Sequence, residues 1–167
     1  MSAAEATINY SQDRTPAFLV FDTESVPDGR LLSLVKYPDE DLTPEEAVRR
    51  AQQEARQRSA DGSDFLPVPF QYPVAVCMIT VGADYGLRRI RPLASPHFHP
   101  GKIVSDFWKG IEHYPQARLV TFNGRGFDLP LLELAAFRYG CCGSKYFQYM
   151  RHRFNGNHLD IMDWLGN

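Results

Sequence analysis

Three acidic side chains stand where two apolar segments of this chain end. Asp22 and Glu24 follow the apolar residues 17–21, and Asp128 follows a second apolar segment, residues 119–122, about a hundred positions later. Two carboxylates held side by side repel each other unless a cation lies between them. Carboxylate oxygens are hard ligands that suit Mg²⁺ or Mn²⁺. The three acids together therefore predict a site for divalent metal ions.

Each acidic motif by itself also has a simpler interpretation. Asp22 and Glu24 could begin a solvent-facing loop, and Asp128 could cap a helix, because aspartate is common at helix N-termini. Asn123-Gly124 would then be an ordinary turn. The metal-site hypothesis requires both motifs at once, with two strand ends of one sheet converging on a shared point.

Strands are expected to position these acids. Side chains two apart on a strand lie on the same face, so Asp22 and Glu24 should point the same way. The continuous apolar run 17–21 is typical of a central strand that is covered on both faces. Residues 74–81 and 87–93 are expected to pair as a hairpin.

Two amphipathic or apolar segments predict helices between and after these strands. Residues 102–114 place Ile103 and Phe107 on one stripe. Residues 129–139 form a leucine-rich segment that ends at Gly140, a common helix terminator. Strands that alternate with helices predict a mixed α/β sheet with helices against its faces.

The remaining segments have weaker patterns. We expect a helical surface insertion at about 25–65, in which residues 25–42 are loop and a polar helix over 43–59 begins with a capping-box signature. Residues 141–157 are aromatic and basic, without a predicted element. Residues 158–161 are expected to start a final element.

Composition limits the class of protein. The 167 residues suit one domain, residues 17–167, preceded by a flexible tail, residues 1–16. A net charge of −2 argues against a protein that coats duplex DNA through general phosphate attraction. No apolar run approaches the ~20 residues of a membrane span, and the N-terminus lacks a signal-peptide layout. We therefore expect a cytoplasmic protein that does not bind membranes.

The two acidic motifs resemble the first and second motifs of the DEDD 3′–5′ exonucleases, whose fold is the ribonuclease H-like sheet. The first resemblance is Phe-Asp-Thr-Glu at residues 21–24, and the second is Asn-Gly-Arg-Gly-Phe-Asp at residues 123–128. Over roughly residues 17–165, the chain is similar to predicted 3′–5′ exonucleases related to the proofreading domain of family B DNA polymerases. The segments that carry this narrower resemblance are 65–70, 121–132 and 158–160.

The resemblance implies a metal role for each acid. Asp22 would bridge two metal ions, Glu24 would hold the first ion, and Asp128 would reach the second through water. In two-metal hydrolysis, ions ~3.5–4 Å apart activate a water and stabilise the leaving oxygen of a phosphodiester. The implied cofactors are two Mg²⁺ or Mn²⁺ ions, and the implied reaction releases nucleotides from a 3′ end.

The resemblance also implies a nucleic-acid partner, with single-stranded DNA favoured. Asn123 and Phe127 would line the groove near the terminal nucleotide. Aromatic side chains stack on bases without reading sequence. Ser25, which follows the first motif, could contact a phosphate, although a loop serine needs no special explanation.

The resemblance predicts a third motif that this sequence does not supply. The family carries a Tyr or His followed four residues later by Asp, whereas His158 precedes Asp160 by two residues, the wrong spacing for one helical face. Asp163 could be proposed as the aspartate of the third motif, but it falls at a position after which sequences of the family continue rather than end. We therefore interpret the chain as a fragment that lacks its C-terminal helices, or as a decayed relative. As it stands, we expect weak metal binding and little or no turnover.

Two other functions stay open. A non-catalytic nucleic-acid-binding or interaction module could keep this fold without the chemistry. A ribonuclease H-like nuclease that cuts internally would share the metal chemistry, and a circular strand distinguishes it, because a circle resists an exonuclease.

Overall fold

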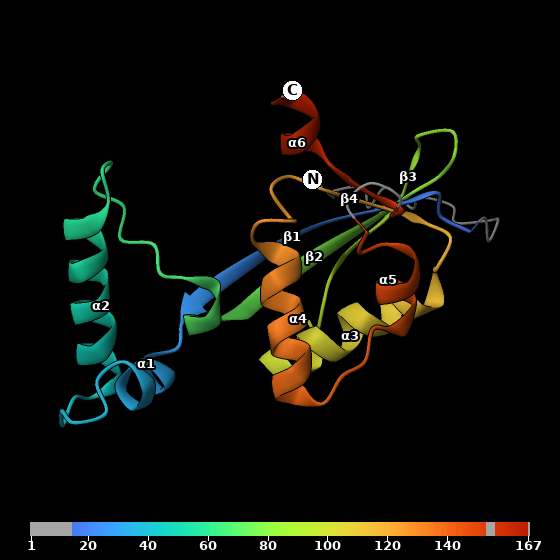
Figure 1. Ribbon diagram of the computed structural model, residues 1–167. Coiled ribbons are helices and arrows are strands. Elements are labelled where there is room, and N and C mark those ends of the chain that lie inside the picture. The colour runs from blue at the N-terminus through green and yellow to red at the C-terminus, as the bar shows by residue number, and fades with distance from the viewer. Residues whose placement is uncertain (1–14, 153–155, 167) are drawn as a thin grey trace, which may run out of the picture.

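A five-stranded mixed sheet organises the chain in the computed structural model, which describes residues 15–152 and 156–166 (Figure 1). The strand order is β3-β2-β1-β4-β5. β1 is antiparallel to β2 and parallel to β4, β5 is parallel to β4, and β3 is antiparallel to β2. The bounds are β1 (Phe18–Pro27), β2 (Gln71–Val81), β3 (Leu87–Pro92), β4 (Arg118–Thr121) and β5 (His158–Asp160).

Helices flank this sheet, which confirms the predicted α/β fold class, a mixed sheet with helices against its faces. Figure 1 shows α3 (Pro100–His113), α4 (Asp128–Tyr139) and α5 (Ser144–Tyr149) on one side of the sheet and α6 (Ile161–Leu165) on the other. The predicted stripe on α3 is confirmed, because Ile103 and Phe107 are fully buried. Most of the predicted tail, residues 1–14, lies outside the described residues.

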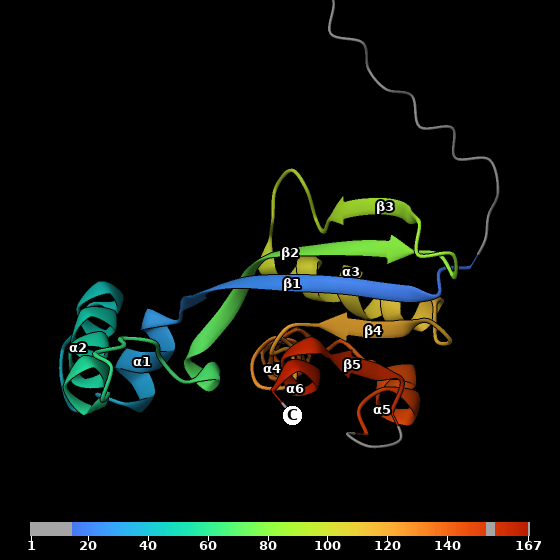
Figure 2. The same cartoon turned by 90° about the horizontal axis from the view of Figure 1, so that it is seen from above.

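An arm, residues 28–66, extends beyond the sheet between β1 and β2 (Figure 2). It contains α1 (Gly29–Val35) and α2 (Pro44–Arg58). The expectation that residues 25–42 are loop is wrong, since β1 runs on to Pro27 and α1 follows it. Helix α1 forms because Asp28 caps its first turn and Leu32 joins a small separate core. The other buried members of that core are Tyr37, Ala47, Ala51 and Leu66.

The predicted polar helix is confirmed as α2, which starts with a complete capping box. The Thr43 amide donates to Glu46 Oε2 over 2.9 Å, and the Glu46 amide donates to Thr43 Oγ1 over 3.3 Å. We expect Thr43→Ala to lower the local stability of α2 by about 1 kcal/mol, because the Glu46 amide loses its acceptor, Thr43 Oγ1. Hydrogen exchange of the α2 amides measures this, and Thr43→Ser should keep the protection. Equal protection in the alanine variant would contradict the prediction.

Residues 141–157, which have no predicted element, contain the short helix α5. Six residues cannot hold a helix by themselves, so packing must supply its stability. Its Tyr146 ring is buried and lies 5.2 Å from the Trp108 ring of α3, centroid to centroid. Within residues 15–152 and 156–166, no helix is both long and apolar enough to cross a bilayer.

Candidate functional site

The parallel strands β4 and β5 end at one edge of the sheet, where the chain turns into α4 and α6, whereas β1 continues past them toward the arm (Figure 2). Asp22 and Glu24 lie in the middle of β1, just past its pairing with β4, and not at a strand end as expected, because β1 runs on to Pro27. Both acids are exposed and alternate with buried Phe21 and Thr23. The two acids therefore share a face of the strand, as their spacing predicts. Strand ends in α/β sheets commonly carry binding sites.

Asp128 opens α4 as a buried carboxylate. Its residue is only 4% exposed, and its Oδ1 has no hydrogen-bond partner among the described residues. Burial raises the pKa of Asp128, the backbone and hydroxyl of Thr23 partly oppose that shift, and the nearby Asp22 charge raises the pKa further. A buried carboxylate with one oxygen unpartnered among the described residues, beside a second carboxylate, is what a divalent cation would stabilise, so this pair fits a metal ligand set.

The third predicted ligand does not complete a cluster here. In the part of the chain that the structure describes, no three histidine, cysteine or acidic side chains are grouped closely enough to hold a metal ion. Glu24 lies on the same face of β1 as Asp22. The charge of Asp22 raises the pKa of Asp128, so these two acids lie close enough to repel each other. The set Asp22, Glu24 and Asp128 therefore stays a prediction as a metal site.

The turn from β4 into α4 needs its asparagine and its glycine. Asn123 has a φ of +59°, a left-handed conformation that asparagine tolerates better than most residues. A Cβ added to Gly124 would lie 2.4 Å from Thr121 Oγ1, so no larger residue fits without a shift. This turn sets where α4 begins and hence where Asp128 lies.

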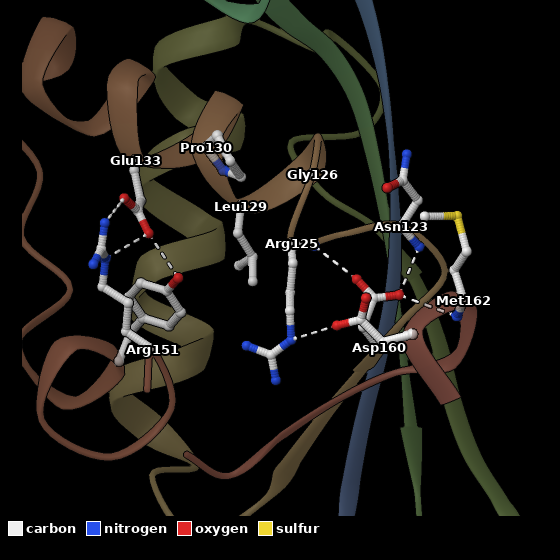
Figure 3. Close-up of a pocket in the computed structure, with 11 residues that line it drawn as sticks. Asn123, Arg125, Gly126, Leu129, Pro130, Glu133, Arg151, Asp160 and Met162 are labelled. Atoms are coloured by element: carbon white, nitrogen blue, oxygen red, sulfur yellow. Dashed lines mark hydrogen bonds and ion pairs between the residues drawn. The ribbon is translucent and has the colours of Figure 1, made fainter. Parts of the chain in front are cut away.

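A second acid, Asp160 at the end of β5, fixes the same turn. The side chain is 3% exposed and accepts hydrogen bonds from the amides of Asn123 and Arg125, each over 2.8 Å (Figure 3). It also accepts from the Met162 amide over 3.2 Å and so caps α6. In the sequence, Asp160 contributes only to the resemblance of segment 158–160 to the predicted exonucleases, and no structural role is predicted for it. Its position at the end of a third parallel strand is the signal that could have identified it.

The predicted substrate residues have defined neighbours. Phe127 is half-buried, and its ring lies 5.3 Å from the ring of Phe65, centroid to centroid. The Ser25 hydroxyl donates to Gln71 Oε1, so a phosphate contact by Ser25 would have to replace or share that bond. The substrate roles of Ser25, Asn123 and Phe127 stay predictions.

A cavity of about 600 Å³ lies beside this edge, along α4. Figure 3 shows Asn123, Arg125 and Asp160 at one end and the pair Glu133 and Arg151 at the other. Glu133 Oε1 lies 3.1 Å from Arg151 Nε and accepts from the Tyr146 hydroxyl over 2.6 Å. The cavity is lined by Asn123 but not by the three predicted metal ligands, so it adjoins the candidate site without containing it.

Buried His158 makes the stability of this edge sensitive to pH. Its Nε2 lies 2.8 Å from Thr121 Oγ1, and burial, with a smaller contribution from Arg125, lowers its pKa to about 4. The unfolded chain binds this proton near pH 6.5, so unfolding takes up a proton between those values. We expect His158 to remove on the order of 3 kcal/mol of unfolding free energy as pH falls from 6.5 to 4.

Urea unfolding of the wild type and of His158→Gln, measured at several pH values, tests this expectation. The variant should lose less stability on acidification, whereas carboxylates elsewhere affect both proteins equally. Parallel pH profiles would show that His158 does not titrate as its burial indicates.

Comparisons with known proteins give one sequence match and several similar structures. Residues 63–167 match a family described as predicted 3′–5′ exonucleases related to the exonuclease domain of PolB. No curated protein matches the chain. Exonuclease I of E. coli with a dA16 oligonucleotide shares 10% identity and a TM-score of 0.46, over 89% of this chain and 28% of that chain. Apo exonuclease I shares 10% identity and a TM-score of 0.48, over 91% of this chain and 30% of that chain. This chain thus spans less than a third of exonuclease I.

Proposed function

Because this chain belongs to the family of predicted 3′–5′ exonucleases related to the exonuclease domain of PolB, we propose that it hydrolyses phosphodiester bonds at the 3′ ends of nucleic acids. The reaction depends on divalent metal ions. The observation that carries the proposal is the buried Asp128 carboxylate, which lies beside Asp22 and whose Oδ1 has no hydrogen-bond partner among the described residues. A cation is the partner whose chemistry suits such a pair.

Asp22, Glu24 and Asp128 would hold the ions, and bound Mg²⁺ or Mn²⁺ supplies Lewis-acid chemistry for phosphodiester hydrolysis. The protein's own contribution is placement. The β1 backbone keeps Asp22 and Glu24 on one face, and the turn held by Asp160 sets the start of α4 and therefore the position of Asp128. Fixed ligands avoid reorganisation during the reaction.

Single-stranded DNA is the proposed substrate. Phe127 immediately precedes Asp128 and is half-buried, so its ring offers a surface beside the acids on which a base could stack. Stacking tolerates any sequence but needs an unpaired base. Asn123 would contact the terminal nucleotide from the same turn.

A second candidate function is a non-catalytic nucleic-acid-binding module of the same fold. The observation that favours it is the incomplete cluster, since the described residues do not bring a third histidine, cysteine or acid to Asp22 and Asp128. This module would bind single strands but leave them intact.

A cleavage assay separates the two candidates. Single-stranded DNA labelled at its 5′ end is incubated with Mg²⁺, with Mn²⁺ or with EDTA, using this chain and the longest polypeptide that its reading frame encodes. An RNA strand of the same sequence tests the sugar preference. From the longer polypeptide we expect a ladder that shortens from the 3′ end, requires metal and is absent with Asp22→Ala, and from these 167 residues alone we expect little or no turnover.

A circular single strand is the matched control and should stay intact. Cleavage of the circle would replace the exonuclease proposal with an internally cutting nuclease. Binding without cleavage in both polypeptides would favour the non-catalytic module, and absence of binding would contradict both candidates.

A further inference from the structure

An exposed aromatic ring from the arm lies against the second acidic motif. Phe65 is 59% exposed, and its ring meets Phe127 at a centroid distance of 5.3 Å and an interplanar angle of 64°. The two rings come from segments 62 positions apart, and Phe127 is the residue before Asp128. We infer that Phe65 and Phe127 form a stacking site for one nucleobase of a single strand, an inference that rests on the proposed function.

The backbone next to Phe65 is held firmly. Its neighbour Leu66 is buried in the arm core, and the Leu66 carbonyl accepts a hydrogen bond of 2.6 Å from Gln71 Nε2. Gln71 is itself buried, and its Oε1 accepts from Ser25 of β1. The end of β1 therefore connects through Gln71 to the residue beside Phe65. Stacking surfaces held in place lose less conformational entropy when they bind.

The arm is also attached to α4, which carries Phe127 at its start. Asp28 Oδ2 lies 2.8 Å from Arg138 Nη1 of α4, and the Asp28 amide donates to the Phe70 carbonyl over 2.7 Å. Each attachment joins residues distant in sequence. The Asp28–Phe70 bond closes the base of the arm, and Arg138, near the C-terminal end of α4, ties that base to the helix that Phe127 precedes.

The geometry of the ring pair suits a base. The edge-to-face arrangement leaves much of the Phe65 ring accessible, while Phe127 forms a second wall at a steep angle. Neither ring carries a charge or a hydrogen-bonding group, so the site would accept any base and would not select duplex DNA, whose bases are already stacked. A base held there would place its backbone near Asp128.

The test measures binding of a fluorescent single-stranded dT oligonucleotide by anisotropy, with Ca²⁺ in place of Mg²⁺ to suppress hydrolysis. We expect Phe65→Ala to weaken binding roughly five- to a hundredfold, because base–aromatic stacking contributes that much per base. Phe65→Trp should bind within about twofold of the wild type, since tryptophan retains a stacking surface.

Tyr85→Ala is the matched control and should leave affinity unchanged. Tyr85 is also a highly exposed aromatic residue, 80% exposed, and stacks on Phe18 with ring centroids 5.6 Å apart. Phe18 begins β1, so this second ring pair lies at the end of the strand away from the acidic motifs.

A scan of abasic nucleotides along the oligonucleotide assigns the effect to a base. One abasic position should weaken wild-type binding by about the factor lost in Phe65→Ala, and the same position should have no effect in that variant. The wild-type scan does not depend on how well a variant folds. If the wild type binds the strand but neither the variant nor any abasic position changes affinity, the stacking site is wrong and the proposed function stands. If the wild type binds no nucleic acid, both are wrong.

Discussion

Replacing Asp128 by asparagine is expected to slow 3′ nucleotide release by roughly a thousandfold, because metal-ligand interactions contribute several kcal/mol in the transition state. The same change should raise the unfolding free energy of the metal-free protein at pH 7 by about 1 kcal/mol. The reason is that Asp128 is buried, its Oδ1 lacks a hydrogen-bond partner among the described residues, and Asp22 repels its charged form. A substitution that lowers the cleavage rate but raises the unfolding free energy identifies a side chain that serves the reaction at the expense of stability.

The two effects are measured separately, by single-turnover cleavage and by urea unfolding in EDTA. Asp84→Asn is the matched control, because Asp84 pairs with Arg88 over 2.6 Å and that contact, with a bond from the Gly86 amide, lowers its pKa. The control should keep the cleavage rate and gain no stability. A destabilised Asp128→Asn protein would mean that the carboxylate is well satisfied in the fold, and an unchanged rate would remove it from the metal site.

Local patterns in the sequence predict the helices and strands whose stabilising faces are periodic. Helix α3 follows from its apolar stripe, and α2 follows from Thr43 and Glu46, because both signals involve residues within one or two turns. Helix α1 was not predictable in this way. It is only seven residues long and lies between Pro27 and Pro38, and it is stabilised by Leu32 packing into a core that α2 completes.

The candidate site shows the same division between local and distant information. The shared face of Asp22 and Glu24 follows from the two-residue period of a strand. The burial of Asp128 depends on how α4 packs against β2 and α3, which no local pattern contains. Phe65 was likewise part of an apolar segment, and only the folded arm brings it to Phe127.

Replacing Asp160 by alanine is expected to lower the unfolding free energy by about 3 kcal/mol. Three amides, those of Asn123, Arg125 and Met162, would lose a charged acceptor in a partly buried turn. The change should also slow cleavage by roughly a hundredfold, because Asp128 would no longer be held at its position and small misplacements of catalytic groups cost about that much.

Asp160→Asn should fall between alanine and the wild type, since one oxygen remains an acceptor while the amide nitrogen faces a backbone N–H. Asp163→Asn is the control for a nearby acid. Its carboxylate lies 3.4 Å from Arg125 Nε and its side chain is 39% exposed, so that contact should contribute under about 1 kcal/mol. Hydrogen exchange then shows whether Asp160 stabilises only the turn before α4 or the whole fold.

If Asp160 positions the turn, the amides of Asn123 and Arg125 should lose protection in Asp160→Ala more than the α3 amides, at a denaturant concentration where the protein stays folded. If α3 and the turn lose protection equally, the slower cleavage reflects general instability. If the turn amides stay protected and the rate falls, Asp160 acts on the reaction by another route. Only selective loss, together with normal cleavage by Asp163→Asn, supports a β5 carboxylate that controls the position of Asp128 from outside the metal site.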